Sequence, residues 1–258
     1  MMKQPSAPSV LAVIPARYGS TRFPGKPLAL LPDGRPMIVH TWERVCDTPG
    51  VHRVVVATDD ERIAAVIRQA GGEAQLTQAH HPSGTDRCWE VASHYPEMDW
   101  VVNVQGDEPG IDRDAIQAAL AVLAQQPQVD IATLMTPLLV SDPAYTDPNA
   151  VKVAVSAFND ATNAVTPHYR ALYFSRAPIP YVRVQPAQPM HYRHMGLYAY
   201  RRNALASFVS APPALLEQVE QLEQLRALAL GLVIGAAVVA KAPRGIDTPQ
   251  DLAAWFDS

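Results

Sequence analysis

Short apolar runs rich in β-branched residues alternate with segments of helical periodicity, and this alternation constrains the fold more than any other feature of the chain. The runs at residues 10–14, 51–58 and 99–104 are typical of strands buried on both faces. Apolar residues with helical spacing separate or follow these runs at residues 36–46, 59–70, 85–95 and 112–125. This order predicts an α/β fold in which helices cover both faces of a mostly parallel mixed sheet, forming a three-layer sandwich.

The second half of the chain has a less regular pattern. We expect strands, some of them antiparallel, at residues 131–135, 151–155, 171–174, 196–200 and 232–239. A long helix is predicted at residues 215–230, and a C-terminal helix at 248–256 with Thr248 as its cap and Pro249 at its first position. No internal repeat or flexible linker interrupts this pattern.

The length of the chain allows one large domain or two small ones. Because the strand and helix pattern is continuous, we expect a single domain over residues 1–258. We expect its core to comprise about 9–130 and 226–258, and an inserted part to comprise about 131–225.

Composition and charge exclude several classes of protein. The chain has 21 Lys and Arg against 25 Asp and Glu, a net charge of −4, whereas a general nucleic-acid binder is basic overall or carries a basic stripe. The cysteines, Cys46 and Cys88, form neither a CxxC pair nor a metal-ligand spacing. The first nine residues lack the apolar region of a secretory signal, and no apolar run is long enough to cross a membrane. We expect a soluble, cytoplasmic protein without nucleic-acid or membrane partners.

Three cations lie in the short loop that follows the first predicted strand. Arg17, Arg22 and Lys26 share this loop with Gly19 and Gly25, whose lack of a side chain lets the backbone approach a ligand. Charge-assisted hydrogen bonds from Arg and Lys make such a loop a natural phosphate cradle, although it matches neither the Walker P-loop nor the Rossmann glycine pattern. The alternative interpretation is a solvated basic loop.

Acidic residues follow two further strands. Asp107 comes directly after the third strand, and Asp247 lies between the last strand and the last helix. One or two carboxylates together with phosphate oxygens are a typical environment for Mg²⁺, but taken singly these residues are equally typical of a turn cap and a helix N-terminus. Cations for a triphosphate and carboxylates for a metal together predict phosphoryl or nucleotidyl transfer.

Other chemistries have weaker support. His80 and His81 are adjacent, so on an extended chain their side chains point to opposite faces and do not share a metal ion. Cys88 lies in a predicted helix and is typical of a buried thiol. Ser20 and Ser83 lack the GxSxG elbow of a hydrolase.

Residues 14–28 closely resemble the signature of the sugar-acid cytidylyltransferases, and within that family the type that activates 3-deoxy-D-manno-octulosonate (Kdo) matches best. Each further match is short, but their shared order along the chain is specific. They lie at residues 56–59, 83–87, 102–109, 148–153, 171–176, 193–198, 222–226 and 245–249.

This resemblance implies a reaction and a fold. CTP and Kdo would give CMP-Kdo, which feeds lipopolysaccharide biosynthesis, and pyrophosphate, by in-line attack of the Kdo C2 hydroxyl on the α-phosphorus with Mg²⁺ as cofactor. The implied fold is like that of the nucleotide-diphospho-sugar transferases. The chain would form a homodimer, with the dimer contact and the sugar site in the inserted part.

The resemblance also implies roles for single residues. Arg17, Arg22 and Lys26 would hold the triphosphate, and Asp107 and Asp247 would ligate Mg²⁺. The cytidine side of the CTP site would be lined by Ala16, Ser83, Thr85 and Gln105. The sugar acid would be contacted by Gln105, Arg176, His194, Tyr198, Glu223 and Gln224. The implied catalytic residues are Arg17, Lys26, Asp107 and Asp247.

Three alternative functions stay open at this point. The first is a cytidylyltransferase for another sugar acid, such as 8-amino Kdo or a sialic acid. The second is a metal-dependent glycosyltransferase, which normally carries a DxD motif; Asp59-Asp60 is easily mistaken for one. The third is a nucleotide-sensing protein without catalysis, against which the retention of both Asp107 and Asp247 argues.

Overall fold

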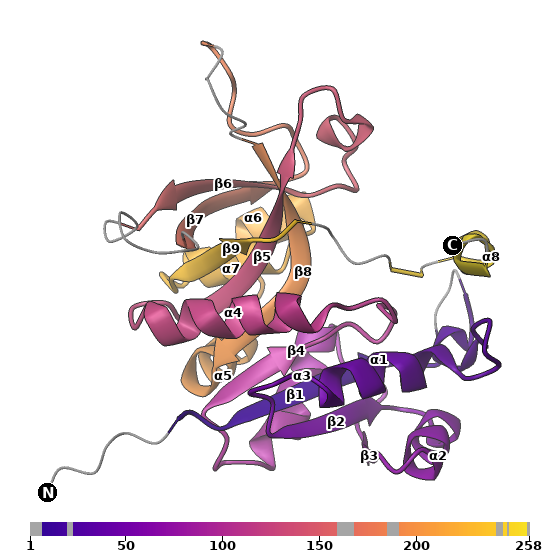
Figure 1. Ribbon diagram of the computed structural model, residues 1–258. Helices are drawn as coiled ribbons and strands as arrows, with labels where there is room; N and C mark the ends of the chain where they lie inside the picture. Colours follow the sequence, from indigo (N-terminus) through magenta and orange to yellow (C-terminus); the bar gives the residue numbers. More distant parts are fainter. Residues whose placement is uncertain are drawn as a thin grey trace, which may run out of the picture. The chain divides into compact units, whose positions relative to one another are not determined.

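The computed structural model describes residues 7–19, 23–158, 168–184, 191–240, 245–246 and 248–256. By its internal contacts the chain forms two compact units, residues 1–114 with 243–258 and residues 115–242 (Figure 1). Residues 115–130 and 226–242, which we assigned to the core, thus belong to the second unit. That the chain functions as a single domain with an inserted part stays a prediction.

The first unit has a doubly wound arrangement of strands and helices. Its strands are β1 (Val10–Ala16), β2 (Arg53–Thr58), β3 (Glu73–Leu76) and β4 (Trp100–Asn103), all parallel in the order β3-β2-β1-β4. Its helices α1 (Met37–Cys46), α2 (Glu61–Gln69) and α3 (Gly84–Ser93) are the connections between them. Right-handed crossovers place α1 and α2 on one face and α3 on the other. The direction of winding therefore reverses between β1 and β4, where α/β sheets bind their ligands.

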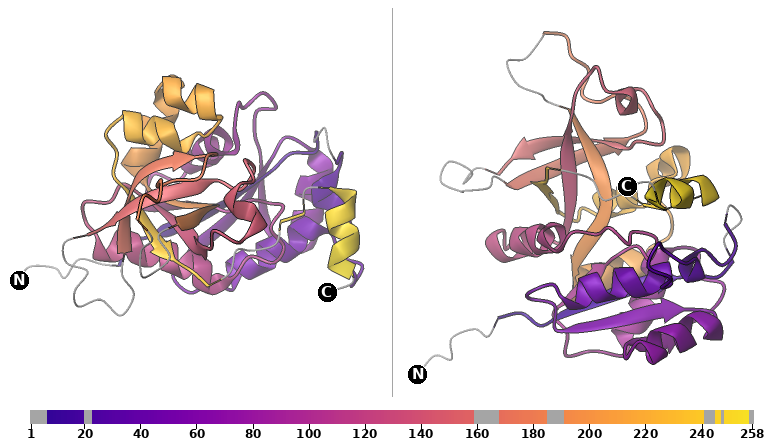
Figure 2. Two further views of the ribbon diagram at one scale, coloured as in Figure 1. Left: turned by 90° about the horizontal axis from the view of Figure 1, so that it is seen from above. Right: turned by 45° about the vertical axis from the view of Figure 1, so that its right-hand side comes forward.

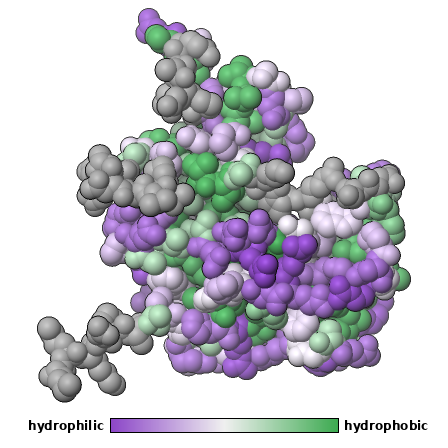
Figure 3. All heavy atoms as spheres, in the orientation of Figure 1, coloured by the Kyte–Doolittle hydropathy of each residue, from purple (hydrophilic) through white to green (hydrophobic). Residues whose placement is uncertain are grey.

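Local sequence accounts for these elements. Leu11, Val13 and Ile14 of β1 are completely buried, as expected of a central strand. Asp60 caps α2 by accepting a hydrogen bond from Arg62 N, and Ser83 caps α3 by accepting from Thr85 N and Asp86 N. Both caps satisfy backbone donors that a helix cannot satisfy itself. The outer side of α1 is hydrophilic in Figure 3.

The C-terminal helix α8 (Pro249–Phe256) belongs to the first unit. Thr248 Oγ1 accepts a hydrogen bond from Asp251 N at 3.2 Å, which confirms Thr248 as its cap. Leu252 and Trp255 pack against a cluster of Leu31, Met37 and Ile246. In Figure 2 this helix, in yellow, lies beside the indigo N-terminal segments. Its contacts link it to the loop after β1.

The second unit contains a mixed sheet. Its strands β5 (Ile131–Leu138), β6 (Lys152–Ala157), β7 (His168–Ser175), β8 (His191–Arg201) and β9 (Ile234–Val238) have the order β8-β5-β9-β7-β6, in which only β5 and β9 pair in parallel. Val122 of α4 (Arg113–Gln125) lies against Gly235, whereas the neighbouring Ile234 lines a cavity with Ala227 of α7 (Gln224–Ala229). Successive strand residues face opposite sides, so helices cover both faces of this sheet. The predicted α/β class with a mixed sheet is confirmed.

The structure differs from the prediction in three elements. The long helix at residues 215–230 is wrong: α6 (Leu215–Glu220) and α7 are separated at Gln221, which has the left-handed φ of 53°. The sequence pattern did not predict β3, because its segment EAQL lacks a β-branched run, nor did it predict α5 (Arg202–Ser210). No helix in the described part of the chain has the length and apolar character that a membrane span requires.

A buried ion pair links α6 to α7. Arg226 donates from Nε to Glu217 Oε2 at 2.9 Å and from Nη2 to Glu217 Oε1, and its guanidinium carbon lies 4.7 Å from the centroid of the Phe208 ring. Only 10% of the Arg226 side chain and 9% of the Glu217 side chain are exposed. Loss of one partner leaves the other charge buried and unpaired.

We predict that Arg226→Met lowers the free energy of unfolding by about 3–5 kcal/mol, because Glu217 then stays buried without its cation. Arg68→Met is the control, since the Arg68–Glu61 pair has side chains that are 47% and 62% exposed. The control variant should lose less than about 1 kcal/mol. Denaturant unfolding followed by circular dichroism measures both, and equal losses would contradict a special role for the buried pair.

Candidate active site

The loops after β1 and β4 approach each other very closely. Gly106 lies directly after Gln105 in the β4 loop, and a Cβ atom at this position would be only 2.8 Å from the carbonyl oxygen of Pro15 in β1. Side chains do not tolerate such a contact, so glycine is required here. The close approach places the residue that follows, Asp107, beside the loop that begins at Arg17.

Lys26 and Asp107 meet at this point. Lys26 Nζ lies 2.6 Å from Asp107 Oδ2, and the two side chains are 11% and 32% exposed. Lys26 starts the short 3₁₀ helix η1 (Lys26–Leu28) immediately after Gly25, whose φ of 72° favours glycine. The structure thus brings together one predicted triphosphate ligand and one predicted metal ligand, although they are far apart in sequence.

Among the described residues, the others predicted for the CTP site occupy the same end of the first unit. Ala16 is the buried last residue of β1, and Arg17 follows it with an exposed side chain. Gly84, at the start of α3, lies near Pro15 and the side-chain oxygen of Gln105. Ser83 uses its hydroxyl to cap α3, and Thr85 is 4% exposed, so these two would offer a ligand mainly their backbone.

Two predicted residues, Arg22 and Asp247, lie outside the described residues. The chain immediately before Asp247 is described, and Ile246 N donates a hydrogen bond of 2.9 Å to the carbonyl oxygen of Asp107. The backbone that leads to Asp247 is therefore attached to Asp107 itself. Among the described residues, no group of three or more His, Cys, Asp or Glu side chains is arranged to hold a metal ion.

Three of the predicted sugar-contacting residues line one small cavity in the second unit. Tyr198, Glu223 and Gln224 surround a space of about 10 Å³, together with Ile131, Tyr200, Phe208, Ala227 and Ile234. The centroid of the His194 ring lies 5.4 Å from the centroid of the Tyr198 ring. A space of this size holds about one water molecule.

An irregularity in β8 brings His194 and Tyr198 together. Thr133 of β5 pairs with Tyr198, but the next residue, Leu134, pairs with Met195, so two residues of β8 bulge out. Thr133 Oγ1 lies 3.0 Å from the Met195 oxygen, 2.9 Å from the Leu197 oxygen and 3.0 Å from His194 Nε2. Since one hydroxyl proton serves the carbonyls, the contact with His194 requires Nε2 to donate. This leaves His194 Nδ1 as an acceptor.

Burial sets the protonation of both aromatic residues. It lowers the pKa of His194 to about 3, so the ring is neutral near pH 7. Burial, with a smaller contribution from the charge of Glu223, raises the pKa of Tyr198 well above its usual value. Tyr198 therefore keeps its proton and can donate a hydrogen bond, whereas His194 can accept one at Nδ1.

Arg176 does not line this cavity, and its side chain instead forms hydrogen bonds with backbone carbonyl groups. Its guanidinium donates to the carbonyl oxygens of Pro148, Glu220 and Gln221 at 2.9, 2.7 and 3.2 Å. The Glu220 carboxylate in turn accepts from Arg176 N at 2.9 Å. These contacts fix the break between α6 and α7, after which Glu223 and Gln224 follow.

Sequence reasoning missed the residues that support the predicted contacts. Lys152 is completely buried and donates to the carbonyl oxygens of Asp147, Ala150 and Arg176 at 2.8, 2.7 and 2.7 Å. A lone lysine within the apolar strand segment VKVAV was the available signal, because lysine is rarely buried without partners. Thr133 offered no comparable signal, since its role depends on the bulge in a partner strand.

The rival sites have structural explanations. Cys88 is completely buried in α3, as predicted. His81 Nε2 contacts the Glu90 carboxylate, which also accepts a hydrogen bond of 3.0 Å from Gln78 N. The His81 ring is therefore held by a carboxylate of α3, and this contact gives no support to a histidine pair on one metal.

Comparison with known proteins supports the same interpretation. The family model described as cytidylyltransferase matches residues 11–234. A relative from Syntrophotalea carbinolica, named 3-deoxy-manno-octulosonate cytidylyltransferase, is 47% identical over 95% of this chain and 96% of its own. One of the same name from Xanthobacter autotrophicus is 50% identical over 96% of this chain and 92% of its own.

Solved structures agree with these relatives. A CMP:2-keto-3-deoxy-manno-octonic acid synthetase complexed with CTP matches with a TM-score of 0.86 and 40% identity, covering 96% of this chain and 97% of that one. A 4-diphosphocytidyl-2C-methyl-D-erythritol synthase from Anaerococcus prevotii shares only the fold, at a TM-score of 0.63, 10% identity and 98% coverage of both chains. The family model spans most of the sequence, and several relatives exceed 40% identity over nearly its whole length. The chain therefore belongs to the cytidylyltransferase family.

Proposed function

We propose that this chain transfers the cytidylyl group of CTP to 3-deoxy-manno-octulosonate, giving CMP-Kdo and pyrophosphate. The observation that carries the proposal is the contact between Lys26 and Asp107, a cation and a carboxylate at the point where the sheet of the first unit reverses its winding. The names of relatives that share nearly half of the sequence support CTP and Kdo as its substrates.

Lys26, Arg17 and Arg22 hold the triphosphate in this proposal. In the structure Lys26 neutralises Asp107, and Arg17 extends into solvent at the end of β1. An incoming triphosphate offers Lys26 a stronger set of anionic oxygens, so Lys26 exchanges its carboxylate partner for phosphate. Ala16, Ser83, Thr85 and Gln105 form the cytidine side of the site, with the backbone of the α3 N-terminus as the main donor.

The donor chemistry of the site fits Mg²⁺. Asp107 offers a partly exposed carboxylate, and the hydrogen bond from Ile246 N attaches the chain before Asp247 to the same residue. One or two carboxylates completed by substrate phosphates are the usual protein environment of Mg²⁺. We assign Asp107 and Asp247 as its ligands. When bound, Mg²⁺ supplies positive charge to the triphosphate oxygens.

In this proposal the sugar acid binds against the side chains of the second unit that surround the small cavity, because the cavity itself, at about 10 Å³, is too small to hold a sugar. Tyr198 donates a hydrogen bond to a sugar hydroxyl, and neutral His194 accepts one at Nδ1. Glu223 and Gln224, which line the same cavity, offer further acceptors and donors for the hydroxyls of Kdo. The family resemblance implies two further sugar contacts, Gln105 of the first unit and Arg176 of the second, which donates three of its five N–H groups to carbonyl oxygens.

The reaction is an in-line displacement at phosphorus. The C2 hydroxyl of Kdo attacks the α-phosphorus of CTP and releases its proton to solvent, the bond from that phosphorus to the bridging oxygen breaks, and pyrophosphate leaves. No side chain becomes covalently attached. Arg17 and Lys26 stabilise the charge that develops on the leaving group, and the sugar-binding residues orient the attacking hydroxyl, so catalysis rests on positioning and electrostatics.

We also propose a homodimer and a cytoplasmic role in lipopolysaccharide biosynthesis. Exposed apolar side chains in the second unit support the dimer: Leu172 of β7 is 54% exposed, and Leu215 and Val219 of α6 are 76% and 72% exposed. Leu215 and Val219 are four positions apart on α6 and therefore lie on the same side of that helix, and exposed apolar side chains that gather in one patch are typical of protein interfaces.

The proposed function is tested by measuring the pyrophosphate released from CTP in the presence of Mg²⁺. Purified protein is assayed with Kdo, 8-amino Kdo, N-acetylneuraminate or no sugar acid. We expect release with Kdo and little with the others. Preference for another sugar acid would keep the reaction class and change the substrate, whereas no release with any sugar acid would contradict catalysis.

Asp107→Asn should remove most turnover, at least about 100-fold, since it removes the carboxylate charge at the proposed metal site. The unfolding midpoint should change little, because the Lys26–Asp107 pair is partly exposed. Asp112→Asn is the control: Asp112 lies on the same loop, and asparagine keeps its hydrogen bond to Asp114 N. Near-normal turnover of Asp107→Asn would contradict the metal role.

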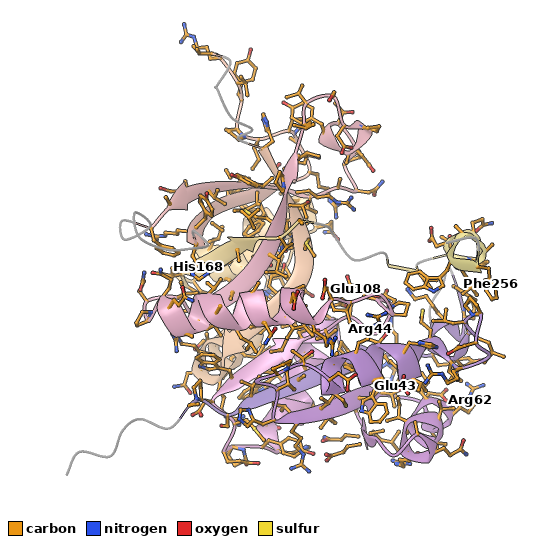
Figure 4. All side chains as sticks on the ribbon, in the orientation of Figure 1. Glu43, Arg44, Arg62, Glu108, His168 and Phe256 are labelled. Carbon is orange, nitrogen blue, oxygen red and sulfur yellow. The ribbon has the colours of Figure 1, made fainter. Side chains whose placement is uncertain are left out.

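Lys26→Ala should raise the KM for CTP about ten- to a hundredfold, the effect of one charge-assisted hydrogen bond. Steady-state pyrophosphate release at varied CTP measures this, with Arg44→Ala as a control that removes an exposed cation from α1 (Figure 4). An unchanged CTP requirement would refute the triphosphate role of Lys26.

The pKa of about 3 for His194 predicts that its ring stays neutral from pH 8 down to 5. The unfolded chain takes up a proton near pH 6.5, so this histidine contributes stability above that pH, and the contribution decreases as the pH falls. NMR titration of the His194 ring resonances should show no transition above pH 5. The His194→Gln variant should lose less stability than the wild type between pH 7 and 5, and a transition near pH 6.5 would contradict the assignment.

A further inference from the structure

Asp59 and Asp60 follow β2 directly, and the proposed function gives this acidic pair no role. The pair is easily mistaken for the DxD motif of metal-dependent glycosyltransferases. We propose that Asp59 and Asp60 instead anchor Tyr18, and that Tyr18 holds the loop carrying Arg17 and Lys26 in the conformation that binds the triphosphate. The inference rests on the proposed function, because it concerns how the CTP site is organised.

Asp60 fixes the side chain of Arg62. Its Oδ1 accepts hydrogen bonds from Arg62 N and Arg62 Nε, both at 2.9 Å, and its Oδ2 accepts from Arg62 Nη2 at 2.7 Å. The guanidinium group is thereby held in one plane at the start of α2, where Figure 4 shows Arg62. A fixed guanidinium plane is well suited to stack on an aromatic ring.

Tyr18 is the ring on which Arg62 lies. The Arg62 guanidinium carbon is 3.5 Å from the centroid of the Tyr18 ring. The same ring contacts Gly25: a Cβ atom at Gly25 would lie 3.1 Å from Tyr18 Cε2. Gly25 N also donates a hydrogen bond of 3.0 Å to the Tyr18 carbonyl oxygen. Tyr18 thus holds Gly25 with both its ring and its backbone.

Asp59 holds the backbone of Tyr18 from the other direction. Its Oδ1 accepts from Tyr18 N at 3.4 Å, and its Oδ2 lies 3.5 Å from Nη2 of Arg87, whose side chain is only 4% exposed. Arg87 also donates to Thr77 Oγ1, so it is itself fixed. Both carboxylates of the pair therefore face protein cations, as anchors do, and not an open metal site.

The consequence concerns the two cations of the loop. Arg17 precedes Tyr18, and Lys26 follows Gly25. The contacts between Tyr18 and Gly25 therefore fix the backbone from which both cationic side chains extend. A loop held in its binding conformation spends less of its interaction energy on ordering when CTP arrives. Tyr18, Arg62 and Asp59 are positioning residues in this scheme, because they act through the loop and not on the reacting atoms.

Calorimetric titration with CTP and Mg²⁺ in the absence of sugar tests the anchor. Arg62→Met should raise the Kd for CTP about two- to fivefold, the effect of one exposed cation–π contact. Tyr18→Leu should raise it further, because it also removes the contact with Gly25, whereas Tyr18→Phe keeps the ring and should bind CTP nearly as the wild type does. The KM for the sugar acid should stay unchanged in Arg62→Met.

Arg53→Met is a matched control. Arg53, on β2 of the same unit, forms two hydrogen bonds with Glu73 of β3, and its guanidinium carbon lies 4.4 Å from the centroid of the ring of Tyr95, which follows α3. Like Arg62→Met, Arg53→Met removes an ion pair and a contact between a guanidinium group and a tyrosine ring. The unfolding midpoint should therefore change as in Arg62→Met, while CTP affinity stays at the wild-type value. The Arg62 side chain is 60% exposed, so its variant remains informative if Tyr18→Leu fails to fold.

Two results would overturn the inference while the proposed function stands. One is wild-type CTP affinity in both Arg62→Met and Tyr18→Leu. The other is an equal loss of affinity in Arg53→Met and Arg62→Met, which would indicate general destabilisation. If the wild-type protein itself neither binds CTP nor releases pyrophosphate, the proposed function fails first, and the anchor fails with it.

Discussion

The contact between Lys26 and Asp107 depends on how closely the backbones after β1 and β4 approach each other. Gly106 makes this approach possible, because a Cβ atom there would collide with the carbonyl oxygen of Pro15. Parallel strands wound in opposite directions from β1 bring both loops to one edge of the sheet. The Tyr18 anchor and the hydrogen bond from Ile246 N then hold the flanking segments of the same edge. The chemistry proposed for the first unit therefore depends on backbone packing.

In the second unit, cationic side chains hold the backbone segments in place by donating hydrogen bonds to carbonyl oxygens. Lys152 and Arg176 each donate to three carbonyl oxygens, and together they fix the segments before β6, after β7 and between α6 and α7. Buried carbonyl groups need donors, and a cation satisfies several of them at once. The result is a frame in which Tyr198, Glu223 and Gln224 share one cavity. The sugar contacts proposed for these three residues depend on that placement.

The prediction of the fold was accurate where local patterns dominate and wrong where distant contacts decide. Apart from β3, the strands and helices of the first unit were anticipated, because buried runs and helix caps such as Asp60 and Thr248 are visible in the sequence. The helix at residues 215–230 was wrong because its apolar pattern continues through the break. Hydrogen bonds from Arg176 to the carbonyl oxygens of Glu220 and Gln221 hold that break open. Nothing within the helical segment itself indicates this partner.

The sequence by itself determined the class of the fold, the membership of a family and the identity of most candidate site residues. Residue type and spacing carry this information, because strand burial, helix capping and a loop of cations are local properties. Only the tertiary structure decided that Lys26 meets Asp107, that the bulge in β8 joins His194 to Tyr198, and that the Asp59-Asp60 pair holds Tyr18. The first and third of these contacts join segments far apart in the sequence, and the second depends on how β8 pairs with β5. Sheet order and register, which no local pattern encodes, therefore decide all three.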